Sequence, residues 1–140
     1  MDEIVYKLRY SNVAQDYVKQ IKESAFDKDG KRKTGNRHLA VYDGLKNLFE
    51  DIIPYRALDP TFTLETKHGI SLGGVNRAKQ GRLRIYWIAS SAKRLVYILF
   101  IGYRKEGDRK DAYRKFVAHL RRGSFDRLFA NLDQKNPLTR

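Results

Sequence analysis

Arginine and aromatic side chains alternate in a short segment of the sequence, at a spacing that can bind phosphate. Arg82, Arg84 and Tyr86 occupy every second position, and a strand with this period places all three on one face. Two rises of ~3.3 Å would set the two arginines about 7 Å apart. Guanidinium groups pair bidentately with phosphates, and an aromatic ring can stack on an unpaired base. The pattern favours an anion-binding strand face, although either arginine can instead pair with an acid.

Two more residues stand where a rigid element would hold them. Arg104 follows Arg94–Tyr103, the most apolar segment of the chain, so the end of a buried strand would position it. Tyr113 lies in the first turn of the expected C-terminal helix, where its ring can pack in the core while its hydroxyl faces a cleft. Their structural alternatives are a solvated arginine at a strand end and an ordinary core tyrosine. Asp111 at the start of that helix suits the helix dipole.

A histidine beside a lysine is a weaker candidate for acid–base chemistry. His68 follows Lys67 in the sequence KHGISLGG, and histidine titrates near neutral pH. A lone histidine is more often structural, and a hairpin loop explains the paired glycines as well as a phosphate loop does. His38 and His119 have no acidic or histidine partner at the spacing of metal ligands, and the chain has no cysteine. The sequence therefore predicts no metal site and no cofactor.

The charge of the chain points to a polyanionic partner. The 140 residues carry a formal net charge of +13, and 41% of them are hydrophobic, enough for a folded core. A domain this basic typically binds nucleic acid, and the other partners to consider are an acidic protein and an anionic membrane surface. No segment approaches the ~20 apolar residues of a membrane helix, and MDEIVYKLRY does not resemble a signal peptide. We expect one cytoplasmic domain over residues 1–140, with 133–140 as a loose tail.

The cations are concentrated between Gly81 and Gly123. This segment contains twelve Lys or Arg residues but only three acids, and tyrosine and tryptophan residues are interleaved with them. Cations mixed with rings suit single-stranded RNA, since its phosphates pair with guanidinium groups and its bases stack on aromatic side chains. The alternative is that most of these cations are solvated and most of the rings lie in the core.

The order of hydrophobic patterns predicts an α+β fold. About four strands would form a small, mainly antiparallel sheet, with two N-terminal helices and a C-terminal helix packed on it. Ser11 or Asn12 would cap the first helix, and Pro54 would close the second. The expected strands are residues 4–10, 64–72, 82–89 and 94–103, and the expected helices are residues 12–29, 36–53, about 111–123 and a short one at 125–132.

Several blocks of the sequence together resemble the RelE/ParE toxin superfamily. Two blocks lie at the expected strands, one block opens the C-terminal helix, and the order of the N-terminal elements also fits. Other blocks are similar to the YhaV branch of that superfamily. The superfamily blocks are Gly81–Tyr86, Ile101–Lys105 and Asp111–Tyr113, and the YhaV-like blocks are Lys67–Gly73, Arg109–Phe116 and Arg121–Gly123.

The resemblance implies a ribonuclease toxin of a type II toxin–antitoxin pair, an mRNA interferase. Such an endoribonuclease cleaves RNA, often on the ribosome, by attack of the substrate's own 2′-hydroxyl on the adjacent phosphorus, without a metal ion. Matched to the family's motifs, the catalytic residues would be Arg84, Arg104 and Tyr113, with Arg82 beside them. The second-rank, substrate-binding residues would be Lys67, His68, Tyr86, Lys105, Arg109, Lys110 and Asp111.

The resemblance also implies a protein partner. In the YhaV branch the toxin is neutralised by an acidic cognate antitoxin of the PrlF type, which has an AbrB-like DNA-binding portion. A net charge of +13 suits both an RNA substrate and an acidic inhibitor. The alternative function is a non-enzymatic nucleic-acid-binding protein, or a gyrase-poisoning toxin like ParE, on the same fold.

Overall fold

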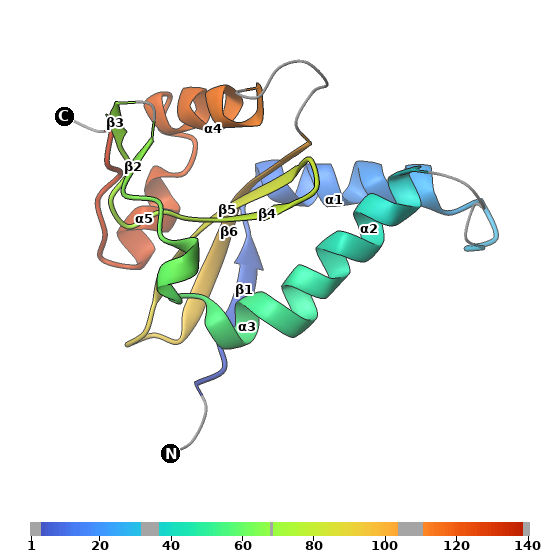
Figure 1. Cartoon of the computed structure of the whole chain (residues 1–140), viewed down its shortest axis with the longest axis horizontal. Helices are drawn as coiled ribbons and strands as arrows, with labels where there is room; N and C mark the ends of the chain where they lie inside the picture. The colour runs from blue at the N-terminus through green and yellow to red at the C-terminus, as the bar shows by residue number, and fades with distance from the viewer. Residues whose placement is uncertain (1–3, 32–36, 68, 104–110, 139–140) are drawn as a thin grey trace.

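A four-stranded mixed sheet forms the centre of the molecule, in the strand order β1-β6-β5-β4 (Figure 1). The computed structural model describes residues 4–31, 37–67, 69–103 and 111–138. The N-terminal strand β1 (Lys7–Tyr10) is parallel to β6 (Leu95–Tyr103), whereas β5 (Leu83–Ser90) is antiparallel to both β6 and β4 (Asn76–Gln80). The predicted α+β class, with a small and mainly antiparallel sheet, is confirmed.

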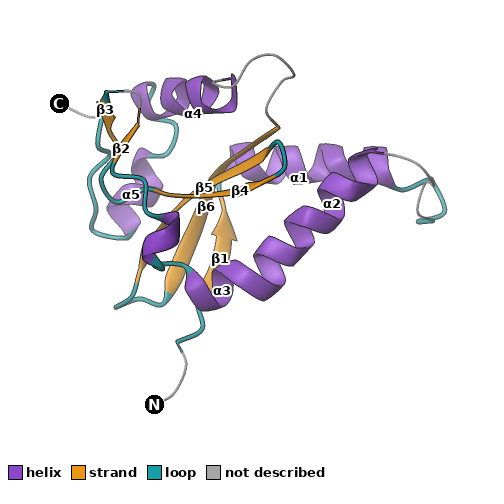
Figure 2. Cartoon of the chain, viewed as in Figure 1, coloured by secondary structure: helices purple, strands orange, loops and turns teal. Residues whose placement is uncertain are grey.

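The N-terminal helices cover one face of this sheet (Figure 2). Helix α1 (Asn12–Ala25) begins at the expected cap, since the Ser11 hydroxyl accepts a hydrogen bond of 3.0 Å from the Ala14 amide. The same hydroxyl donates to the Leu99 carbonyl at 2.5 Å, which ties the start of the helix to β6. In the described part of the chain, no helix combines the length and the apolar character needed to cross a membrane.

The second helical segment differs from the prediction at Pro54. Helix α2 (Arg37–Asn47) continues through a π-helical turn (Leu48–Ile52) into α3 (Ile53–Arg56). The expectation that Pro54 closes the helix is wrong, because Pro54 lies in the first turn of α3, where a missing N–H leaves no helical hydrogen bond unmade.

Two hydrophobic cores lie on opposite faces of the sheet. On the α1 side, Ile85, Trp87 and Ile98 are completely buried, and the Trp87 indole donates to the Ala57 carbonyl at 2.9 Å. On the other side the strands meet α4 (Asp111–Arg121) and α5 (Asp126–Asn131). Side chains of β6 enter both cores, as expected for a central strand with apolar residues on both faces.

The fourth strand of the sheet is not the one that the sequence predicts. Within residues 64–72, β2 (Thr66–Lys67) and β3 (Ile70–Ser71) pair as a separate two-stranded sheet and do not join the central one, and Gly69 has a φ of +77°. The sheet is completed instead by β4, and Asn76 at the start of β4 also forms an isolated antiparallel bridge with Thr63. The sequence NRAKQ of β4 contains one apolar residue, so hydrophobic alternation does not reveal it.

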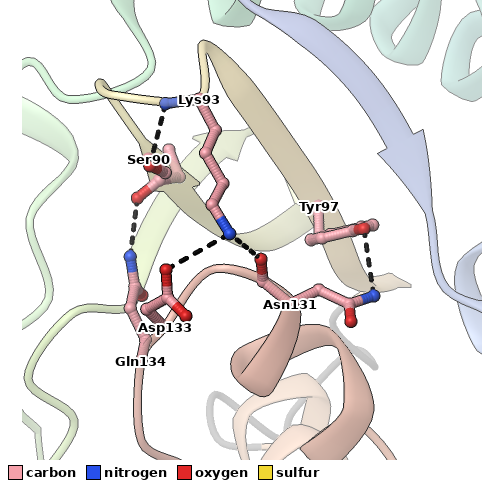
Figure 3. A network of polar contacts seen from close by, with 7 residues as sticks. Ser90, Lys93, Tyr97, Asn131, Asp133 and Gln134 are labelled. Atoms are coloured by element: carbon pink, nitrogen blue, oxygen red, sulfur yellow. Dashed lines mark hydrogen bonds and ion pairs between the residues drawn. The ribbon is translucent and has the colours of Figure 1, made fainter.

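The segment after α5 is held against the β5–β6 hairpin (Figure 3). The Lys93 ammonium donates to the Asn131 carbonyl at 2.5 Å and lies 3.3 Å from the Asp133 carboxylate. The Gln134 amide donates to the Ala89 carbonyl at 2.8 Å. Asn136 is buried and bonds to the Leu120 carbonyl at 2.8 Å. Up to Leu138 this segment therefore differs from the loose tail expected from its polar sequence.

Candidate functional site

Tyr86 lies at the centre of a cluster of cations and hydroxyl groups. Its ring is 1% exposed and stacks on Phe116 of α4, with 4.1 Å between the ring centroids. Burial raises the pKa of its hydroxyl, while the charges of Arg77 and Arg84 and a hydrogen bond with Arg77 act in the opposite direction. The hydroxyl of Tyr113 is close enough to interact with it electrostatically. Two arginines and two tyrosines thus meet on the α4 face of the sheet.

Arg77 is a member of this cluster that the sequence reasoning missed. It lies on β4 directly across from Tyr86 of β5, and Lys79 lies across from Arg84. Residues that pair directly across two antiparallel strands project their side chains to the same face of the sheet. Arg77 and Lys79 therefore add two cations to the face that carries Arg84 and Tyr86. The sequence signal for this strand is the alternation of the cations Arg77 and Lys79 around the apolar Ala78. This alternation can be interpreted only once the turn at Gly81 and Arg82 has set the pairing of β4 with β5.

Arg84 is held at the end of the β4–β5 hairpin. One guanidinium nitrogen donates to the Gly81 carbonyl at 2.7 Å and to the Leu83 carbonyl at 2.9 Å. On the other side, Arg84 pairs with Gly102 of β6. A methyl group at Gly102 would lie 2.9 Å from the Phe100 ring and 3.0 Å from the Ala112 side chain. The absence of a side chain there lets the first turn of α4 pack directly on β6.

Tyr113 connects α4 to the β2–β3 hairpin. The side chain is 7% exposed, and its hydroxyl donates a hydrogen bond of 2.6 Å to the carbonyl oxygen of Lys67. Burial raises the pKa of this hydroxyl, and the nearby charge of Arg121 opposes the rise. Tyr113 is therefore protonated at neutral pH, and it can donate a proton or a hydrogen bond rather than accept a proton.

Two sequence-predicted residues lie apart from their expected positions. Arg82 is not on β5, which begins at Leu83; it occupies the turn after Gly81, whose φ is +59°. The expectation that Arg82 and Arg84 share a strand face is wrong, because the turn takes the first of them out of the ladder. Asp111 opens α4 as expected, and its carboxylate pairs with Lys115 at 3.4 Å.

Asp111 and Lys115 face a groove on the other flank of α4. This groove has a volume of about 490 Å³ and runs between α1 and α4 over the end of β6. Asp16 and His119 also line it, so its walls carry both signs of charge. A second groove of about 530 Å³ lies between α1 and α2, over Tyr10 and Phe49. Neither groove is lined by Arg84, Tyr86 or Tyr113.

The remaining predicted site residues lie outside the residues that the structure describes. Within the residues that the structure describes, no three His, Asp or Glu side chains are arranged to hold a metal ion. The predicted residues outside the described ones are His68, Arg104, Lys105, Arg109 and Lys110.

Comparisons with known proteins show a similar fold among solved structures, but they do not assign the chain to a family. No family model and no curated protein matches the chain. Among solved structures, it is similar to a chain of the toxin–antitoxin complex RelBE2 from Mycobacterium tuberculosis, with a TM-score of 0.51 and 12% identity over 74% of this chain and 95% of that one. The chain is also similar to the isolated E. coli RelE toxin, with a TM-score of 0.43 and 11% identity over 82% of this chain and 98% of that one. At this identity, the match to the RelBE2 complex shows that the chain shares a fold with one of its components.

Proposed function

We propose that this protein is the toxin of a type II toxin–antitoxin pair and acts as a metal-independent endoribonuclease in the cytoplasm. The observation that carries the proposal is that Arg77, Arg84 and Tyr86 share one sheet face and that the hydroxyl of Tyr113 comes close to them from α4. The fold shared with a chain of the RelBE2 complex supports it. So does the resemblance of separate sequence blocks to the RelE/ParE superfamily and its YhaV branch.

The proposed reaction needs little chemistry from the protein beyond charge and proton transfer. The 2′-oxygen of RNA bonds to the adjacent phosphorus, the bond from phosphorus to the 5′-oxygen breaks, and a 2′,3′-cyclic phosphate and a 5′-hydroxyl result. The proton of the 2′-hydroxyl leaves to a base, and the 5′-oxygen gains a proton. Because the substrate supplies the nucleophile, a Ser-His-Asp triad is not needed.

The described residues of the cluster have roles that their positions support. Arg84, with Arg77 beside it, would neutralise the charge that develops on the phosphorane oxygens. Tyr113 is protonated at neutral pH and would donate a proton to the leaving oxygen. To do so, its hydroxyl would give up the hydrogen bond to the Lys67 carbonyl and form one to the substrate. Arg104 remains a second phosphate-binding candidate on sequence grounds. Arg82, Lys67, His68, Lys105, Arg109, Lys110 and Asp111 remain second-line candidates for contacts with the RNA.

The proposed partner is an acidic antitoxin of the PrlF type. The net charge of +13 favours an acidic inhibitor that covers the basic sheet face. The neighbour RelBE2 was itself solved as a toxin–antitoxin complex. A small acidic protein with a DNA-binding portion, encoded next to this chain, is therefore expected.

The direct test is cleavage of labelled RNA in the presence of EDTA, with and without ribosomes. We expect fragments that end in a 2′,3′-cyclic phosphate. A nuclease contaminant is excluded by an Arg84→Ala preparation purified in parallel, which should leave the RNA intact. If the wild-type protein arrests growth but leaves RNA intact in both settings, the endoribonuclease proposal is wrong and the gyrase-poisoning or binding function takes its place.

A further inference from the structure

Helix α4 carries two arginines on the flank that borders Tyr113. At about 100° per residue, Arg114 and Arg121 point to nearly the same side of the helix, and at ~1.5 Å per residue they lie about 10 Å apart along it. Both are exposed. Both arginines lie next to the row of buried side chains on α4 that includes Tyr113 and Val117. Because the Tyr113 hydroxyl bonds to Lys67 of β2, this is the flank next to the β2–β3 hairpin.

The opposite flank of α4 has different neighbours. Lys115 and His119 line the groove toward α1. Arg122, only one position after Arg121, donates to the Nδ1 atom of His119 at 3.2 Å. The two consecutive arginines therefore point to different sides of the helix, and only the first lies on the Tyr113 side.

The position of Arg121 is fixed by the end of the helix. Gly123 has a φ of +76°, its amide donates to the Leu120 carbonyl at 3.1 Å, and the Ser124 amide donates to the His119 carbonyl at 3.1 Å. This is the arrangement that commonly terminates helices. Within the described residues no carboxylate pairs with Arg121. Its charge is felt at the Tyr113 hydroxyl, so the guanidinium lies on the side of the candidate site.

We propose that the flank of α4 with Arg114 and Arg121 binds the phosphates of single-stranded RNA on one side of the scissile linkage. This inference rests on the proposed function for the identity of the polyanion. Phosphate contacts position a nucleic acid without reading its sequence, and guanidinium groups make the strongest of them. This pair of phosphate contacts at Arg114 and Arg121, called the phosphate track below, would extend the site from Tyr86 and Tyr113 along the helix. It would hold the RNA strand in register for in-line attack.

A simpler role for these arginines is stabilisation of the helix end. Cations in the last turn interact favourably with the helix dipole. Arg121 and Arg122 share that benefit, because both lie at the end of α4 and carry the same charge. Substituting each one separately therefore distinguishes a phosphate track on one flank from a general effect of charge.

The test is binding of a fully 2′-O-methylated RNA oligonucleotide, which cannot undergo 2′-hydroxyl attack, measured by fluorescence anisotropy over a range of salt concentrations. Arg121→Gln should weaken binding at low salt about fivefold to tenfold and reduce the slope of log K against log salt by about 0.7, the loss of one phosphate contact. Arg114→Gln should do the same. Arg122→Gln is the matched control and should change the affinity less than about twofold.

The outcomes separate this inference from the proposed function. Equal losses in Arg121→Gln and Arg122→Gln, or no loss in Arg121→Gln, would overturn the phosphate track. Thermal unfolding of each variant ensures that a loss of binding is not a loss of fold. If the expected salt slopes are found while unmodified RNA stays intact, the track stands and the endoribonuclease proposal fails. If RNA is cleaved but Arg121→Gln leaves the salt slope unchanged, the endoribonuclease proposal stands and the phosphate track fails.

Discussion

The hydroxyl of Tyr113 donates a hydrogen bond of 2.6 Å to the main-chain carbonyl of Lys67, 46 residues earlier in the chain. This bond joins the first turn of α4 to a hairpin that is not part of the main sheet. In this bond the Tyr113 hydroxyl is the donor. Tyr113 thus has two roles to distinguish: its hydroxyl holds the β2–β3 hairpin to α4, and the same hydroxyl is the proposed proton donor.

Tyr113→Phe should separate these two roles. Removing one partly buried hydrogen bond should cost about 1 kcal/mol of unfolding free energy, measured by urea denaturation. If the hydroxyl also protonates the leaving oxygen, the cleavage rate should fall by about 10²-fold or more. Tyr55→Phe, at a tyrosine that is 45% exposed, is the control. A variant that cleaves RNA at the wild-type rate would leave Tyr113 only its structural role.

Arg84→Ala should abolish most of the activity without unfolding the domain. The side chain bonds to the Gly81 and Leu83 carbonyls at the end of a hairpin, so the unfolding free energy should change by no more than about 1 kcal/mol. The rate of RNA cleavage should fall by about 10²–10³-fold, as when one transition-state donor is removed. Arg9→Ala on the opposite edge strand is the control. Growth arrest that persists with Arg84→Ala would place the site elsewhere.

Gly102→Ala tests the close packing of α4 on β6. The added methyl group would meet the Phe100 ring at 2.9 Å and the Ala112 side chain at 3.0 Å, and both are buried. Overpacking of this kind should destabilise the protein by about 1–3 kcal/mol. Gly73→Ala is the matched control, since nothing lies within 4 Å of a methyl group there. Equal stability of the two variants would show that α4 shifts freely on the sheet.

The stability of the protein should depend on pH through His119. Burial lowers the pKa of His119, and the charge of Arg122 lowers it further. The unfolded chain then binds a proton at a higher pH than the folded one, so the contribution of His119 is present above pH 6.5 and is lost as the pH falls through the folded pKa. Protonation would also place a proton on the nitrogen that faces Arg122, 3.2 Å away.

His119→Gln isolates this effect from the titration of the carboxylates. Urea denaturation of both proteins at pH 7.5 and 5.5 gives two differences in unfolding free energy. The wild type should lose more stability between these pH values than the variant does. Identical losses would mean that His119 has the same pKa in the folded and the unfolded chain.

The central strand, the first helix cap and the C-terminal helix were predictable because each has a strong local signal. Ser11 precedes a helical pattern, and the segment that became β6 is apolar on both faces. Strand β4 has no such signal. Its position depends on pairing with β5 and on the turn at Gly81, which are tertiary features.

The candidate site was predictable only where its residues lie on elements with a clear pattern. Arg84 and Tyr86 were proposed from their alternation along a strand, and Tyr113 from its place at the start of the C-terminal helix and from the resemblance to the toxin superfamily. Arg77 was missed together with β4, the strand that carries it. Arg82 was placed on a strand face because the alternation of the sequence extends into the turn, whereas the chain reverses at Gly81 and Arg82.

The parallel pairing of β1 with β6 has a consequence for how the molecule is made. Ser11 meets Leu99, 88 residues later, and Lys7–Tyr10 pair with Leu95–Ile98. On the ribosome, β1 is synthesised before β6, its neighbour in the sheet, and β6 emerges only after the whole β4–β5 hairpin. Strand β1 must therefore wait without its partner while the intervening segments are made, and closing so long a loop is expected to be a slow step of folding.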